Sequence, residues 1–120
     1  AQVYECPVWT ASQTNRAGLN AEVITMESIS EAFNKCFVAD FIFTISRTIE
    51  DKIGNEGRVF IAKNRNGPDG IVFPIIMDTK NVFLNILSST NETPSEIAEK
   101  SIQKQAQKLK EKYKEFKKER

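Results

Sequence analysis

Residues 58–78, RVFIAKNRNGPDGIVFPIIMD, constrain the fold most strongly because they predict a β-hairpin. Both arms, 58–65 and 70–78, are rich in the β-branched and aromatic residues that favour strands. Between them stand the turn-forming residues Gly67, Pro68, Asp69 and Gly70. The chain is therefore expected to contain a sheet in which these two arms are antiparallel neighbours.

Three other segments predict strands. Residues 41–46, FIFTIS, form a near-continuous apolar run, which predicts a central strand covered on both faces. Residues 82–87 predict a further strand, and residues 7–11, PVWTA, predict a short buried one. The polar segments 12–25 and 48–57 predict loops.

Two helices complete an α/β pattern. Ser28 and Glu31 have the spacing of a capping box, which predicts a helix from there to about Phe37. Pro94 follows a Ser/Thr/Asn-rich linker and predicts the start of a helix that runs to about Lys117. We therefore divide the chain into a folded unit, 1–90, and a linker with a tail helix, 91–120.

The composition excludes several kinds of catalysis. Histidine is absent and there are only two cysteines, so a zinc site, a Ser-His-Asp triad and a Cys-His dyad are excluded. No apolar run approaches the length of a membrane span, and the first residues do not resemble a secretory signal. We expect a cytoplasmic protein, in a bacterial or phage-infected cell, with reduced thiols and no membrane contact.

Lys63 and Arg65 are two cations at the tip of an otherwise apolar hairpin. Strand alternation puts both on one face, about 6.5–7 Å apart along the strand. Two such cations repel each other unless an anion or an acidic group lies between them, and a phosphate suits this position because arginine offers a rigid fork of donors. The structural alternative is a solvated hairpin end.

The segment SQTNR follows the first expected strand and places Gln13 and Arg16 at its carboxyl end. In open α/β sheets this edge is where ligands bind. A glutamine there can hold a water or a phosphate oxygen, as nucleotide hydrolases require. The structural alternative is a polar loop that caps the sheet.

The segments TASQTNR, SISEA, VADFIFTISR and VFIAKNRNGPDGIVFPI follow one another in a specific order. In order and approximate spacing they resemble the DnaB-type hexameric replicative DNA helicases, and SISEA is more similar to the phage members. The resemblance covers residues 6 to about 87, and KNRNGPDG is its most specific part. It implies the C-terminal half of a RecA-like ATPase core, with a mixed sheet that ends in a β-hairpin, followed here by a basic amphipathic helix.

The resemblance also implies roles for individual residues. Gln13 matches the glutamine that senses the terminal phosphate of ATP, and Arg16 lies in the same nucleotide-binding motif. Lys63 and Arg65 match the pair that reaches the ATP of a neighbouring identical subunit, the arginine acting as a finger. Such fingers accelerate phosphoryl transfer by about 10³–10⁵.

Two segments match the loops that bind single-stranded DNA in the family. They place Gly18, Asn20, Ser30 and Glu31 among the candidate contacts. Bacterial members carry an arginine before the glutamate, whereas this chain has Ser30 there. Backbone amides at a helix N-terminus can still hold a phosphate, and the capping box is the structural alternative.

The sequence lacks the phosphate-binding loop G-x-x-x-x-G-K-[ST] and an apolar strand that ends in a Mg²⁺-binding acid before Pro7. We therefore expect a part of a longer motor protein that uses ATP and Mg²⁺. The isolated chain is expected to bind neither cofactor and to be inactive. A RecA-like recombinase and a free-standing, non-enzymatic module that binds protein or nucleic acid are the alternatives.

The tail helix is basic. Residues 94–120 hold nine Lys/Arg and five Glu, a net charge of +4, whereas the other residues hold eight against eleven, a net charge of −3. Apolar residues recur along the tail in a narrow stripe that is typical of a docking or coiled-coil helix. A solvated helix, a replisome protein and a nucleic-acid backbone remain as alternative explanations.

Overall fold

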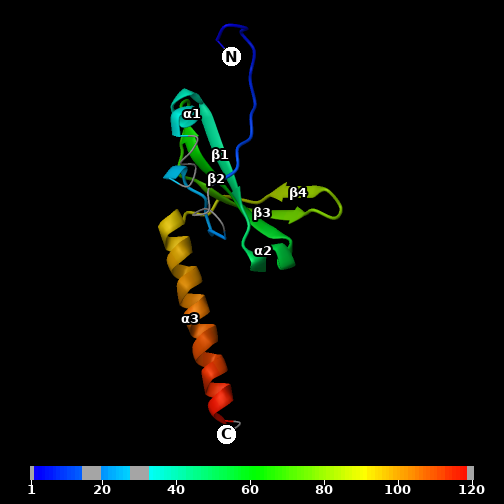
Figure 1. Ribbon diagram of the computed structural model, residues 1–120, viewed down its shortest axis with the longest axis vertical. Coiled ribbons are helices and arrows are strands. Elements are labelled where there is room, and N and C mark those ends of the chain that lie inside the picture. The colour runs from blue at the N-terminus through cyan, green and yellow to red at the C-terminus, as the bar shows by residue number, and fades with distance from the viewer. Residues whose placement is uncertain (1, 15–19, 28–32, 119–120) are drawn as a thin grey trace.

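A computed structural model describes residues 2–14, 20–27 and 33–118 (Figure 1). The elements in chain order are α1 (Phe33–Val38), β1 (Phe41–Ser46), α2 (Ile49–Gly54), β2 (Glu56–Asn64), β3 (Val72–Asp78), β4 (Phe83–Ile86) and α3 (Pro94–Lys118). The four strands form one antiparallel sheet in the order β1-β2-β3-β4. Figure 1 shows α3 extending away from this sheet. The protein is thus of the α/β type.

The predicted hairpin is confirmed as β2 and β3. Ile61 closes it through two backbone hydrogen bonds: its N–H donates to Ile71 O at 2.9 Å, and its oxygen accepts from Gly70 N at 2.8 Å. Gly70 has a φ of 74°, a left-handed conformation that a side chain disfavours. The predicted strand at 82–87 and the predicted tail helix are confirmed as β4 and α3.

The sheet has two chemically different faces. Cross-strand partners point to the same side. The pairing therefore gathers one set of side chains on what we call the apolar face: Phe43, Ile45, Val59, Ile61, Phe73, Ile75, Met77, Leu84 and Ile86. The opposite face, which carries Thr44, Ser46, Arg58, Phe60 and Val72, is covered by the segment around residues 22–24.

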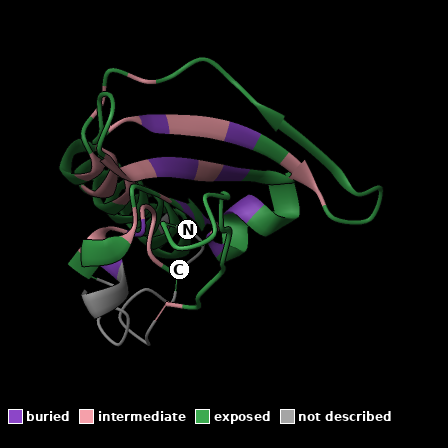
Figure 2. Cartoon of the chain, turned by 90° about the horizontal axis from the view of Figure 1, so that it is seen from above, coloured by how far each residue is buried: buried purple, intermediate pink, exposed green. Residues whose placement is uncertain are grey.

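Burial is concentrated at the centre of the sheet. The buried apolar residues of the described chain are Ile24, Cys36, Val59, Phe60, Val72 and Ile75. Figure 2 shows buried and half-buried residues following one another along the strands of the sheet. The rim of the apolar face is open instead: Phe43 is 41% exposed and Ile86 is 53% exposed. Trp9 packs edge-on against Phe43, with ring centroids 6.4 Å apart.

The prediction of a central, doubly covered strand at 41–46 is wrong. Within the described residues, β1 is an edge strand whose strand partner is β2. The apolar run hides an alternation, because Thr44 and Ser46 face the covered side. Their hydroxyls donate to Ile24 O at 2.5 Å and to Glu22 O at 2.7 Å, respectively.

Two related predictions are also wrong. Residues 7–11 form no strand, and the sheet of the described chain is antiparallel rather than mixed. A strand needs a hydrogen-bonding neighbour, and Pro7 has no N–H to offer. Trp9 therefore contributes through its ring contact and remains 77% exposed.

The loop predicted at 48–57 contains a helix, α2. Thr48 caps it: its side chain accepts from Asp51 N, and Thr48 N donates to the Asp51 carboxylate at 2.8 Å. Asn55 ends it in a left-handed conformation with a φ of 55°. The helix predicted to end near Phe37 is confirmed as α1, whereas the capping box at Ser28 and Glu31 lies outside the described residues.

Candidate functional site at the hairpin end

A β-bulge in β2 sets the direction of Lys63. Phe43 pairs with Ile61 and Ile42 pairs with Lys63, so Ala62 is an extra residue in β2. Without this bulge, Lys63 would share the apolar face with Ile61. The bulge instead puts Lys63 opposite Ile42, on the side of the sheet where α1 lies.

Lys63 is bound to the end of α1. Its Nζ donates to Cys36 O at 2.8 Å and to Phe37 O at 3.3 Å. Both carbonyls belong to the last turn of α1, where helix carbonyls have no partner within the helix and a cation is favourable. Lys63 therefore fixes α1 against the end of the hairpin.

Arg65 is bound to the segment that follows α1. Its backbone N–H donates to Asp40 O at 2.9 Å, and its guanidinium forms an ion pair with the Asp40 carboxylate. The two side chains are 52% and 65% exposed. Asp40 thus supplies a carboxylate to Arg65, whereas Lys63 binds backbone carbonyls, and an anion shared by both cations stays a prediction.

The turn between β2 and β3 is ordered by Asn64. Its Oδ1 accepts from Asn66 N at 3.3 Å, and its Nδ2 donates to Pro68 O at 3.3 Å. A Cβ on Gly67 would lie 2.8 Å from Asn64 Nδ2, which is too close for a normal contact. The backbone that carries Arg65 is thus held by specific contacts rather than left as a loose loop.

The other predicted site residues lie elsewhere. Gln13 is exposed in an irregular segment, and no hydrogen bond links it to Lys63 or Arg65. Asn20 Oδ1 accepts a hydrogen bond from Ile49 N at 3.2 Å, so its side chain ties residue 20 to the start of α2. The remaining candidates, Arg16, Gly18, Ser30 and Glu31, lie outside the described residues.

A polar cluster under the sheet was not predicted from the sequence. Arg58 forms ion pairs with Glu22 at 2.7 Å and with Asp51 at 2.9 Å. Ser101 of α3 donates to Glu22 Oε1 at 2.6 Å. These bonds join the loop at residue 22 and α3, which are far apart in the sequence, to the neighbouring elements α2 and β2.

Asp51 is the most buried carboxylate of this cluster. Burial on its own raises its pKa, but hydrogen bonds from Thr48 and the charge of Arg58 outweigh it, so the pKa lies below the ordinary value of 3.8. The spacing of Thr48 and Asp51 is a capping-box signal that could have revealed this helix start. Nothing in the local sequence could have paired Arg58 with Glu22.

The two groups of charges differ in what they can do. In the described part of the chain, every buried polar side-chain atom has a hydrogen-bond partner, so the cluster around Arg58 is structural. No group of three or more potential metal ligands occurs among the described residues, and none of the described helices is long and apolar enough to cross a membrane. At the hairpin end, by contrast, the Arg65 guanidinium is about half exposed to solvent.

Comparison with known proteins finds no match for this chain among protein-family models, curated proteins or solved structures.

Proposed function

We propose that this chain forms the C-terminal part of a RecA-like ATPase of the DnaB-type replicative helicase group. In the assembled ring, Lys63 and Arg65 act on the ATP held by a neighbouring identical subunit. Gln13 senses the terminal phosphate of the ATP that is bound to its own subunit. The ring moves along single-stranded DNA. The observation that carries the proposal is the position of Arg65, which projects into solvent from a backbone that is fixed.

Arg65 can exchange its partner at low cost. The ion pair with Asp40 is more than half exposed on both sides, and exposed pairs are worth about 0–1 kcal/mol. A phosphate offers the guanidinium two oxygens in a matching geometry and more charge than one carboxylate. The bond from Arg65 N to Asp40 O is independent of the side chain and keeps the finger in position during the exchange.

Lys63 supports this finger from the same end of the sheet. Its ammonium group holds two carbonyl oxygens of α1, and α1 leads directly into Asp40. To contact a nucleotide itself, Lys63 has to leave these two oxygens, which are weaker partners than a phosphate. Its first role in the proposal is therefore to position the segment that bears Asp40, and its second is to add positive charge.

The apolar face supports an origin in a larger domain. Its rim residues Phe43, Ile45, Leu84 and Ile86 are each at least 41% exposed. These residues lie on the two edge strands, β1 and β4. Large exposed apolar side chains can mark a surface that contacts other parts of a protein, and the sheet of a RecA-like core is covered on both faces. A free-standing module, the alternative function, would have to leave the rim of this face open to water.

ATP and Mg²⁺ are cofactors of the complete motor in this proposal. The described residues offer no cluster of acidic metal ligands, and the sequence has no glycine-rich phosphate loop. The phosphate cradle and the metal site therefore come from other parts of the assembly. What this chain adds is hydrogen-bond donors and positive charge at the subunit boundary.

The test is ATP hydrolysis by the complete protein on single-stranded DNA. Arg65→Ala and Arg65→Lys should each lower kcat by about 10³-fold or more, with nucleotide affinity little changed, because the finger serves the neighbour's transition state. When either variant is mixed with wild-type subunits, the ATPase activity should fall by more than the fraction of variant subunits in the mixture. Lys80→Ala, which removes an exposed lysine from the turn after β3, is the matched control and should be fully active. Normal turnover by Arg65→Ala would overturn the assignment.

A further inference from the structure

From Ile102 onward, α3 carries an exposed apolar stripe. Its members are Ile102, Ala106, Leu109, Tyr113 and Phe116. The spacings of four, three, four and three residues match the a and d positions of a heptad, with Ala106 and Tyr113 at a. The large residues of the stripe are 60–70% exposed.

The proximal half of α3 holds the helix to the body. Thr93 and Glu96 form a capping box at its start: Thr93 N donates to the Glu96 carboxylate at 2.7 Å, and Glu96 N donates to Thr93 Oγ1 at 3.3 Å. Ser101 is bonded to Glu22, and Lys108 lies 3.6 Å from Glu50. The N-terminal part of α3 is thus bound to the rest of the protein, while the part beyond Lys108 extends away from the sheet (Figure 1).

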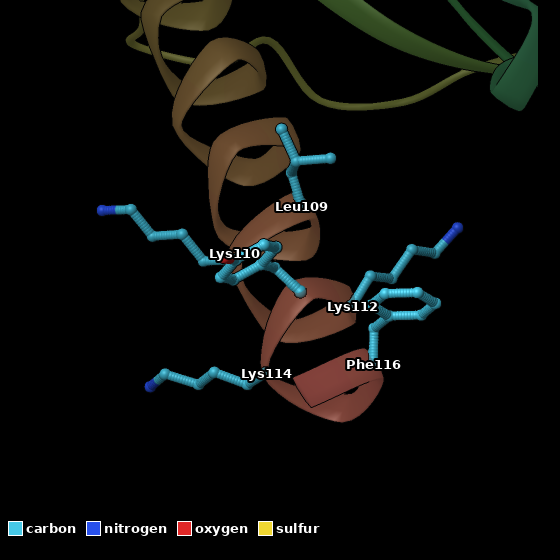
Figure 3. Close-up of a pocket in the computed structure, with 6 residues that line it drawn as sticks. Leu109, Lys110, Lys112, Lys114 and Phe116 are labelled. Carbon is cyan, nitrogen blue, oxygen red and sulfur yellow. The ribbon is translucent and has the colours of Figure 1, made fainter. Parts of the chain in front are cut away.

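Lysines flank the stripe on both sides. Lys110 and Lys117 occupy e positions and Lys112 occupies a g position, whereas Glu111 and Glu115 fall at f and c, away from the stripe. Figure 3 shows Lys110 and Lys112 projecting to opposite sides of the helix beside the depression that Leu109 and Phe116 help to line. The surface is therefore an apolar seam between two cationic edges.

This charge pattern selects against pairing with a second copy. In a parallel pair, Lys112 of one helix meets Lys117 of the other. In an antiparallel pair, lysines at e meet lysines at e, and lysines at g meet lysines at g. Like charges at these positions are destabilising. The favourable partner carries acidic side chains at the same positions.

We propose that residues 102–118 of α3 dock an amphipathic helix of another protein, one whose apolar seam is flanked by Asp or Glu. Leu109, Tyr113 and Phe116 supply the apolar contacts, and Lys110 and Lys112 select the acidic partner. The stripe is as narrow as a coiled-coil seam, which fits a helix better than a membrane. A nucleic-acid backbone would need the lysines but not the apolar residues between them. The inference is independent of the function proposed above.

The experiment uses the full chain and synthetic heptad peptides as probes. One peptide has Leu at a and d with Glu at e and g, and its counterpart has Lys in place of Glu. Fluorescence anisotropy should show that the chain binds the acidic peptide at least tenfold more tightly than the basic one. Leu109→Ala/Phe116→Ala should weaken this binding at least tenfold. Lys110→Glu/Lys112→Glu should reverse the preference, and circular dichroism checks that each variant keeps its helix.

Lys104→Glu/Lys118→Glu is the matched control, since it makes the same change of net charge at the f positions of the heptad pattern. It should bind the acidic peptide like the wild type. Equal loss of binding in this control would overturn the inference and reduce it to a general effect of charge. Tighter binding to anionic phosphatidylserine vesicles or to a single-stranded oligonucleotide than to the acidic peptide would also overturn it. So would self-association that Leu109→Ala abolishes.

Discussion

Arg65 is joined to Asp40 twice, through a backbone hydrogen bond of 2.9 Å and through an ion pair between the side chains. The backbone bond lies at the end of the β1–β2 pairing, whereas the ion pair is largely exposed. The position of the residue and the partner of its charge are therefore controlled separately. This separation suits a side chain that has to release one anion and take another.

Asp40→Asn should release the guanidinium without moving its backbone. The exposed ion pair is worth at most about 1 kcal/mol, so the free energy of unfolding should change by no more than that. The affinity of the chain for tripolyphosphate should rise about two- to fivefold, because the competing carboxylate is gone. An NMR titration that follows the Arg65 side-chain signal shows whether tripolyphosphate binds at Arg65 and measures its affinity.

Asp69→Asn is the control for this titration, because it removes a carboxylate from the same hairpin end at an exposed turn position. If the two variants bind tripolyphosphate equally well, general electrostatics explains the binding. If Asp40→Asn leaves the affinity unchanged, Asp40 does not compete for the finger.

Asp51 should make the stability of the protein depend on pH. Its pKa is lowered in the folded state, so its contribution is fully present above the unfolded value near 3.8 and is lost as the pH falls through the folded value. Asp51→Asn should lower the free energy of unfolding by about 1–3 kcal/mol at pH 6, because Arg58 then loses one of its two carboxylate partners. The difference between the two proteins should shrink as the pH falls below 3.8.

Urea unfolding at pH 6 and at pH 3 measures this difference. Asp78 and Glu96 also have lowered pKa values through hydrogen bonds to neighbouring groups, but they are common to both proteins and cancel in the comparison. A difference that stays constant from pH 6 to pH 3 would show that the Asp51 charge contributes nothing.

The hairpin was predictable because its signals are local. Turn residues at 67–70 and β-rich arms on both sides act within some 20 residues of chain. The same holds for α3, whose start at Pro94 and helix-forming composition can be read directly. The turn residues likewise place Lys63 and Arg65 at the end of this hairpin, whereas the common anion expected between them stays a prediction.

The errors came from interactions between distant segments. Whether β1 is central or at an edge depends on its neighbours, and the alternation of Thr44 and Ser46 with Phe43 and Ile45 was a sign that only one face is covered. The partners of Lys63 could not be read from the sequence, since a single extra residue in β2 decides which side it faces. The pairing of Arg58 with Glu22 links residues 36 positions apart.

Gly70 should be required because of its backbone conformation, and not because a side chain at this position would clash with neighbouring atoms. Its φ is 74°, yet nothing lies within 4 Å of the position that a Cβ would take. Gly70→Ala should therefore lower the free energy of unfolding by about 1–2 kcal/mol. Gly54→Ala is the matched control at the end of α2, where a Cβ would meet only the Glu56 side chain at 3.7 Å, and it should be neutral or stabilise by up to about 1 kcal/mol. Thermal and urea unfolding of both variants separate the two cases.

The apolar face should make the isolated chain self-associate. Ile45 and Leu84 lie on this face and are 42% and 45% exposed, so placing a charge on each should weaken association at little cost in packing. We expect sedimentation velocity to show dimers or larger species that grow with concentration for the wild type, and monomers for Ile45→Lys/Leu84→Lys. Ile49→Lys/Ile53→Lys makes the same chemical change on α2, where the residues are 65% and 83% exposed, and it should still associate. A wild-type chain that stays monomeric at every concentration would mean that this face needs no cover, which would favour a free-standing module over a part of a motor domain.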